Sequence, residues 1–252
     1  MAFSATRMLM AAGFTGNIPS GYVAAFFSGT STASRITIPT TTTFDTASTG
    51  IISVWVNFTA FQTDNMIFGT TAGNIFFLRY NHTNNRAQCT IANSANTANI
   101  NILTTVTLTT GTWNNIVCSW NASSSVGTMY INGSGPGSPT FSGGSFVTAF
   151  STDTPYILGY APSNEAGAYT NGCVSEFYFA PGQFLDFTSP TNIALFYNSG
   201  NPVNLGSNGQ TPTGTAPALY WHGQYNNLSN LGTLGGSFTA AGNALTNCSS
   251  AP

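Results

Sequence analysis

Apolar and polar residues alternate in many short segments of this chain. In Gly111–Ser134, for example, Ile116, Cys118 and Trp120 fall on one side of an extended backbone, with smaller residues between them. This period of two is typical of a strand that is half-buried in a sheet. A polar loop, a second short strand and an Asn-Gly turn follow. The stretch therefore predicts a β-hairpin that presents Trp120 and Tyr130, two large side chains that need a facing sheet to cover them.

Similar segments occur along the chain between turns rich in Gly, Asn, Thr and Pro. Ile51–Asn57 is apolar on both faces at its centre, which predicts a central strand between two covered faces. Strands at this regular spacing, without helical periods between them, predict a sandwich of two sheets. The other predicted strands are Arg35–Pro39, Met66–Phe68, Ile75–Tyr80, Arg86–Ile91, Ile100–Leu108, Phe146–Phe150, Tyr156–Tyr160, Cys173–Phe179 and Ala218–His222.

One short segment has the pattern of a helix. Ser189 is a suitable N-cap, and Pro190 is well placed at the first helical position. Ile193, Phe196 and Tyr197 share one face of about two helical turns. The sequence predicts one short helix in an otherwise all-β chain.

The chain of 252 residues is short enough to form a single all-β domain. We expect an N-terminal arm or edge strand over residues 1–25 and a β-sandwich over residues 26–180. A loop-rich C-terminal extension over residues 181–252 is expected to pack on the same domain, with two short strands near its end.

The composition predicts a folded core under an almost uncharged surface. Hydrophobic residues make up 42% of the chain and aromatic residues 13%, whereas charged residues make up 4%, against a usual share of about 25%. The chain has no lysine, although lysines commonly protect exposed sheet edges from association. We therefore expect faces and edges covered by partners, further copies of this chain among them. A secreted or virion protein that tolerates a neutral surface is the alternative.

Charge and hydropathy also exclude two classes of partner. The formal net charge of −2 offers no basic surface for nucleic acid or for an anionic membrane. No stretch approaches the run of about 18 apolar residues that a membrane-spanning helix needs. Neither nucleic acid nor a membrane is an expected partner.

The hairpin also carries a family resemblance. Gly111, Trp113, Ile116 and Ser119-Trp120, followed by Gly127 and Met129-Tyr-Ile-Asn-Gly133, resemble the central hairpin of laminin-G-like, concanavalin A-like jelly rolls. With the upstream strands, the resemblance covers Phe26–Phe179. It implies an antiparallel jelly-roll sandwich of two sheets, and the residues we expect in its structural core are Trp55, Trp113, Trp120 and Tyr130. This fold carries lectins, glycanases, adhesion modules and virion proteins alike.

The C-terminal third resembles laminin-G-like proteins of tailed bacteriophages. The shared features are a Pro-Gly-Gln-Phe-Leu-Asp run at Pro181–Asp186, a short helix, the Pro/Thr/Gly segment Thr211–Pro217 and a glycine-rich tail. The resemblance implies a virion surface protein, either a capsid decoration or a head spike or fibre subunit, with other virion proteins as partners. Because no heptad or fibre-shaft repeat is present, a compact decoration subunit is favoured.

Enzymatic chemistry is not expected. Retaining glycanases of this fold place an acid and a nucleophile about 5 Å apart on one strand, in an E-x-D-x-x-E pattern. The six acids have no such spacing, and no G-x-S-x-G nucleophile turn is present. The acids are Asp45, Asp64, Asp153, Glu165, Glu176 and Asp186.

The alternative function is a glycan-binding, lectin-like module of a tail fibre or secreted adhesin. Such a site would place aromatic side chains beside polar loops, and the candidates are Tyr160, Tyr169, Trp221 and Tyr225. The favoured interpretation of Trp221 and Tyr160, however, is that they are core residues.

Few residues are candidates for binding a metal ion or for forming a disulfide. Relatives of this fold often bind Ca²⁺ through loop oxygens, which makes Asp45 and Asp153 the candidate ligands, although each also suits a turn. No other cofactor is expected. Cys89 and Cys118 fall in predicted strands and are expected to be buried free thiols. The Gly-Cys-Val run at Cys173 resembles that of laminin G domains, whose cysteine is disulfide-bonded, and Cys248 is its possible partner.

Overall fold

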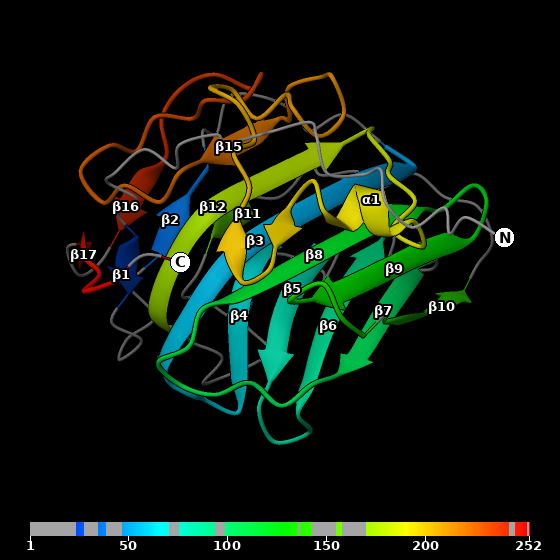
Figure 1. The fold of residues 1–252 in the computed structure, drawn as a ribbon, viewed down its shortest axis with the longest axis horizontal. Helices are drawn as coiled ribbons and strands as arrows, with labels where there is room; N and C mark the ends of the chain where they lie inside the picture. The colour runs from blue at the N-terminus through cyan, green and yellow to red at the C-terminus, as the bar shows by residue number, and fades with distance from the viewer. Residues whose placement is uncertain are drawn as a thin grey trace, which may run out of the picture.

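The computed structural model describes residues 24–27, 35–38, 47–70, 76–93, 99–135, 137–142, 155–157, 170–241, 245–250 and 252. These residues form two antiparallel sheets that lie one over the other (Figure 1). The predicted all-β sandwich of two antiparallel sheets is therefore confirmed. Within the described part of the chain, no helix is long and apolar enough to cross a membrane.

Seven strands of the described residues form the first sheet, in the order β17-β1-β12-β3-β8-β9, with β15 also paired to β12. Their bounds are β1 Ala25–Phe27, β3 Thr49–Ala60, β8 Asn114–Asn121, β9 Val126–Ile131, β12 Asn171–Pro181, β15 Leu219–Trp221 and β17 Thr246–Asn247.

The second sheet has eight described strands, in the order β10-β7-β6-β5-β4-β11-β2-β16. Their bounds are β2 Arg35–Thr37, β4 Asp64–Thr70, β5 Phe76–Asn81, β6 Arg86–Ala92, β7 Asn99–Thr105, β10 Ser138–Ser142, β11 Pro155–Ile157 and β16 Thr239–Ala241. A small hairpin of β13 (Tyr197–Asn198) and β14 (Asn201–Pro202) and the helix α1 (Pro190–Ile193) complete the described elements.

Inward-facing side chains from both sheets form the main core. On β5, for example, Phe76, Leu78 and Tyr80 are buried in it, and the residues between them are only half-buried. β3 is buried on both faces along most of its length, as its sequence pattern predicts. Trp120 on β8 lies in this core and contacts the ring of Phe76 at a centroid distance of 5.6 Å. The alternation along each strand thus creates the hydrophobic layer between the sheets.

A second apolar cluster covers the outer face of the seven-stranded sheet. Ile193, Phe196 and Phe187, from the segment around α1, pack against strand residues such as Tyr178 and Val117. Figure 1 shows this yellow segment in front of β3 and β8. The described helix has only four residues, shorter than the two turns expected, because the chain turns directly into β13. The outer face of this sheet is therefore occupied by the chain itself.

Three of the four residues predicted for the structural core lie outside the layer between the sheets. Trp55 is buried, but on the outer face of β3, where its ring stacks on Tyr197 at a centroid distance of 5.9 Å. Met129 and Ile131 take the inward positions of β9, so Tyr130 points outward and is half-buried against the α1 cluster. Trp113 precedes β8 and is half-buried beside the cluster around Cys173. The prediction that a facing sheet covers Tyr130 is wrong, because alternation places it on the opposite face from Trp120.

The C-terminal extension contributes strands to both sheets. β15 pairs with β12, β17 pairs with β1, and β16 pairs with β2 in the second sheet. Residues 219–247 therefore complete the sandwich in addition to packing on it. Residues 1–23 of the expected arm and the predicted strand Phe146–Phe150 lie outside the described residues.

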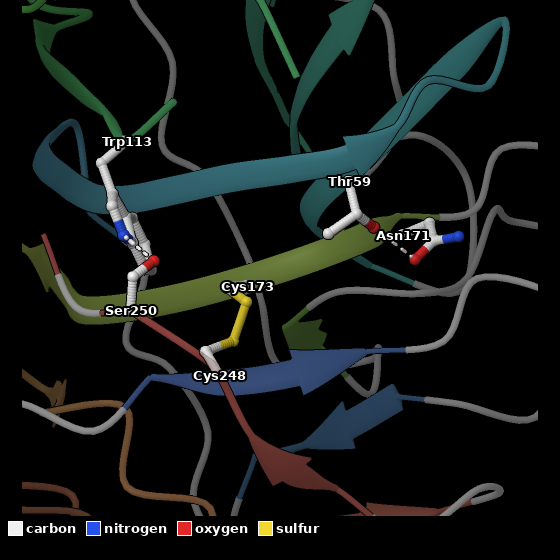
Figure 2. Close-up of a disulfide and its surroundings, with 6 residues drawn as sticks. All are labelled: Thr59, Trp113, Asn171, Cys173, Cys248 and Ser250. Atoms are coloured by element: carbon white, nitrogen blue, oxygen red, sulfur yellow. Dashed lines mark hydrogen bonds between the residues drawn. A yellow bond between two sulfur atoms is a disulfide. The ribbon is translucent and has the colours of Figure 1, made fainter. Parts of the chain in front are cut away.

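A disulfide between Cys173 on β12 and Cys248 holds the end of the chain in place (Figure 2). The two Cα atoms are 6.1 Å apart and 75 positions apart in sequence. Beside it, Trp113 Nε1 donates a hydrogen bond to Ser250 Oγ at 3.2 Å. Cys89 and Cys118 are free and buried. Burial, reinforced by the neighbouring Cys89, raises the pKa of the Cys118 thiol well above its ordinary value. Both cysteines pack in the main core.

Candidate functional site

The outward-facing side chains of β4 to β7 are mostly polar. We call this surface the polar face and define it by Asp64, Phe77, Arg79, Asn81, Arg86, Gln88, Thr90 and Asn101. On β5, β6 and β7 these residues alternate with core residues, so strand geometry alone points them away from the sandwich. Asp64 joins them from the start of β4, where it pairs with Asn81. The pairing β4-β5-β6-β7 then brings them side by side. The result is a continuous polar surface on the eight-stranded sheet.

Gln88 lies at the centre of a hydrogen-bond network on the polar face. Its Oε1 accepts a hydrogen bond from Arg79 Nε at 3.0 Å. Its Nε2 donates to Asn101 Oδ1 at 3.0 Å and to Thr90 Oγ1 at 3.2 Å. Thr90 Oγ1 in turn donates to Asn101 Oδ1 at 3.1 Å. Because each side chain is held by its neighbours, the groups that remain point in defined directions, as a binding surface requires.

Arg79 is also oriented by Asp64 and Phe77. One guanidinium nitrogen lies 3.6 Å from Asp64 Oδ1, which also accepts a hydrogen bond from Asn81 Nδ2 at 2.7 Å. The guanidinium carbon lies 4.9 Å from the ring centroid of Phe77, which is a cation–π distance. The Arg79 and Asp64 side chains keep 17% and 19% of their surface accessible to solvent. They are therefore recessed but reachable by a small polar ligand.

A different polar cluster lies on the seven-stranded sheet. Glu176, on β12, is 2% exposed and has a positive φ of 49° at a bulge against β3. Its Oε2 accepts a hydrogen bond from the Tyr220 hydroxyl at 2.9 Å, and its Oε1 lies 2.8 Å from Nδ1 of His222. A bulge re-aims a side chain, and here it directs the carboxylate toward β15. Both carboxylate oxygens are thus engaged within the protein.

This arrangement changes the protonation of His222. Burial opposes the charged imidazolium, but the hydrogen bond and the negative charge of Glu176 outweigh it, so the pKa of His222 is raised above its ordinary value. The half-buried imidazole of His222 and the carboxylate of Glu176 therefore form a hydrogen-bonded ion pair that links β12 to the end of β15, and we call this pair the tie. A carboxylate this enclosed is not placed to contact a sugar, as a glycanase acid would have to be.

The aromatic residues predicted for a glycan site do not converge among the described residues. Trp221 is 1% exposed, packs in the main core and donates its Nε1–H to the Asn227 carbonyl at 2.9 Å, so a ligand cannot reach it. Tyr225 is 38% exposed. Tyr160 and Tyr169 lie outside the described residues.

The described residues do not include the two aspartates proposed as calcium ligands. Both candidate ligands, Asp45 and Asp153, lie outside the described residues. Within the described part of the chain, no three His, Cys, Asp or Glu side chains come together in a way that could hold a metal ion.

Sequence reasoning did not identify the polar face, although a signal for it is present. In the predicted strands Ile75–Tyr80, Arg86–Ile91 and Ile100–Leu108, the outward positions carry Arg79, Gln88 and Asn101. These hydrogen-bonding side chains become one surface only once the strands are paired in register, and that register is a tertiary property.

Comparison with known proteins adds a family and a fold. A family model, Laminin_G_3 of the concanavalin A-like lectin/glucanases superfamily, matches residues 29–183. No curated protein matches the chain. A candidate carbohydrate-binding protein from Bacteroides ovatus ATCC 8483 superposes with a TM-score of 0.62 at 17% identity, and the match covers 90% of this chain but 59% of that one. The heptameric SAP-like pentraxin of Limulus polyphemus superposes with a TM-score of 0.52 at 15% identity, covering 68% of this chain and 81% of that one. At these identities the likeness shows a common fold.

Proposed function

The chain belongs to the concanavalin A-like lectin/glucanases superfamily, and from this premise we propose that it is a non-enzymatic glycan-binding module. The proposed binding surface is the polar face of β4 to β7. The observation that carries the proposal is the network centred on Gln88, which orients amide, hydroxyl and guanidinium groups across three neighbouring strands. Sugars present rows of hydroxyl groups, and planar side chains with fixed donors and acceptors are suited to bind them.

Two further observations support a glycan as the ligand. Phe77 supplies an apolar ring next to the polar groups, the combination that small-molecule sites use to fix the orientation of a ligand. The solved structure with a TM-score of 0.62 is a candidate carbohydrate-binding protein. The outer face of the other sheet is filled by the α1 cluster, which leaves the polar face as the better platform.

Binding without catalysis is supported by the positions of the acids. Glycoside hydrolysis needs two carboxyl groups about 5–10 Å apart on either side of the sugar bond. Asp64 lies on the eight-stranded sheet, Glu176 is enclosed in the other sheet, and Asp186 lies in the loop before α1. These three described acids therefore provide no pair of carboxyl groups that could lie on either side of one sugar bond.

The proposal is tested by substituting Gln88. The change Gln88→Ala removes the central acceptor and both amide donors, so the neighbouring side chains lose their fixed orientation. We expect binding to the best ligand in a panel of neutral and acidic polysaccharides to weaken by about tenfold or more, measured by affinity electrophoresis and calorimetry.

Gln210→Ala is the matched control, because Gln210 is an exposed glutamine in a loop that does not belong to the polar face. It should bind as the unchanged protein does, and both variants should keep its circular dichroism spectrum. Undiminished binding by Gln88→Ala would contradict the assignment of this face, and no binding to any polysaccharide would overturn the function itself.

A second candidate function is that of a structural subunit on the surface of a bacteriophage particle, in contact with further copies of this chain and other virion proteins. It is supported by the absence of lysine and the 4% share of charged residues, which leave the sheet edges without their usual protection. We expect sedimentation velocity to show concentration-dependent self-association. A stable monomer over the whole accessible concentration range would count against this role.

A further inference from the structure

The open hydrogen-bond donors and the positive charge of the polar face indicate which class of glycan it binds. We infer that the glycan it binds is acidic, carrying a carboxylate or a sulfate group that Arg86 holds, while the donors around Gln88 bind neighbouring oxygens of the same glycan. This inference rests on the proposed function, since it specifies the ligand class of the same face.

The internal network uses up acceptor atoms and leaves donors. Gln88 Oε1, Thr90 Oγ1 and Asn101 Oδ1 all accept hydrogen bonds from within the face. The amide nitrogen of Asn101 carries two N–H groups, and among the described residues it has no hydrogen-bond partner. Asn101 is half-buried, so these donors are directed to a position that a ligand can reach. Around Gln88 and Asn101 the open groups are therefore N–H donors, which favour a ligand rich in acceptors.

Arg86 supplies the charge. It is exposed, pairs in register with Asn81 on β5 and Thr105 on β7, and faces the same side as Gln88. Arg79 stands opposite Gln88, so the two arginines are diagonal neighbours, with Cβ atoms about 7–8 Å apart in such an arrangement. A guanidinium can hold a carboxylate or sulfate by two parallel hydrogen bonds, which are stronger than those to a neutral hydroxyl.

The acid on the face does not cancel this charge. Asp64 lies beside Arg79 and accepts a hydrogen bond from Asn81 through the same oxygen, so it compensates one arginine. The charged side chains of the polar face are therefore two arginines and one aspartate, a net charge of +1 in a chain whose formal net charge is −2. Arg86 is the arginine whose charge Asp64 does not compensate.

The test compares chemically matched acidic and neutral polymers. Polygalacturonate is compared with its methyl ester for a carboxylate, and dextran sulfate with dextran for a sulfate. We expect one acidic polymer to bind at least about tenfold more tightly than its neutral counterpart, which is the difference that one charge-assisted hydrogen bond produces. Added salt should weaken this binding, because exposed charges are screened.

Arg86→Gln and Arg35→Gln change the net charge equally, but Arg35 lies on β2, which β4 and β11 separate from the network on β5 to β7. Arg86→Gln should abolish the preference for the acidic polymer, and Arg35→Gln should retain it. Equal binding of acidic and neutral polymers, without salt dependence, would overturn the acidic specificity and leave the glycan-binding function standing. Failure to bind any of the four polymers would overturn both, whereas an equal loss in the two variants would show general charge attraction and overturn the assignment to Arg86.

Discussion

Gly50 shows how one residue controls the packing of the core. It pairs with Trp120 across β3 and β8. A Cβ atom at this position would lie 2.1 Å from Cζ2 of the Trp120 ring. The indole is buried between other rings, among them Phe76 and Phe179, so it has no free space into which to move. Glycine is therefore the residue that allows the largest side chain of the hairpin to enter the core.

Gly50→Ala is expected to destabilise the protein by about 1–3 kcal/mol, the usual cost of overpacking a core. Chemical denaturation followed by tryptophan fluorescence measures it. Gly69→Ala is the matched control, because the nearest atom to a Cβ there is Met66 Sδ at 3.4 Å, an ordinary contact. Equal stability of the two variants would contradict the packing described for Trp120.

At the scale of elements, the tie between β12 and β15 joins the C-terminal extension to the sandwich. The strands pair in register through Phe177–Trp221 and Tyr178–Tyr220, and Glu176 and His222 form the next pair. Glu176 adopts a positive φ of 49°, which is costly for a non-glycine residue. Its hydrogen bonds to Tyr220 and His222 offset that cost, so the bulge and the tie depend on each other.

This tie makes stability dependent on pH. His222 contacts Glu176 on β12 and Tyr220 on β15. Since the folded-state pKa of His222 is raised, its contribution to stability is complete below its ordinary pKa of 6.5 and is lost as pH rises through the raised value. The free energy of unfolding should therefore fall as the pH rises above 6.5, as measured by denaturant titration.

His222→Gln separates the charge from the hydrogen bond. The glutamine amide can still donate a hydrogen bond to Glu176 but does not titrate. The fall in the free energy of unfolding with rising pH should therefore disappear in the variant. Tyr178, which packs against Tyr220, does not titrate in the same window, because burial raises its pKa to about 12. The same pH dependence in both proteins would show that another group is responsible.

At the scale of the whole molecule, the end of the chain closes the sandwich. β16 and β17 extend opposite sheets within a few residues of each other, and Cys248 follows β17 directly. Its disulfide to β12 fixes the last strand to a central one. Both sheets thus depend on a segment that follows the helix and the loop-rich region.

Removal of the disulfide should destabilise the whole sandwich. The bond closes a loop of 75 positions, and the double variant Cys173→Ala, Cys248→Ala is expected to lose about 2–4 kcal/mol of stability. Thermal denaturation with and without a reducing agent measures this loss. The reductant should lower the melting temperature of the unchanged protein and leave that of the double variant unaltered; an unchanged melting temperature in both would show that the bond does not constrain unfolding.

The positions of most strands along the chain, and the face on which their side chains lie, were predictable from sequence alone. Alternation is a local property of an extended chain, so Trp120 could be assigned to the core and the strands from β2 to β9 located. Tyr130 was misplaced because two large aromatic residues were taken to share a face, whereas the strand period assigns them opposite faces.

What only the tertiary structure decided is which outward-facing residues meet. Gln88 acquires its partners from β5 and β7 through strand register, and Glu176 meets His222 from 46 positions away through a bulge that no local pattern predicts. Sequence periodicity determines direction within a strand, because each residue rotates the side chain by half a turn. Contact between strands depends on pairing, register and bulges, which are set by the packing of the whole chain.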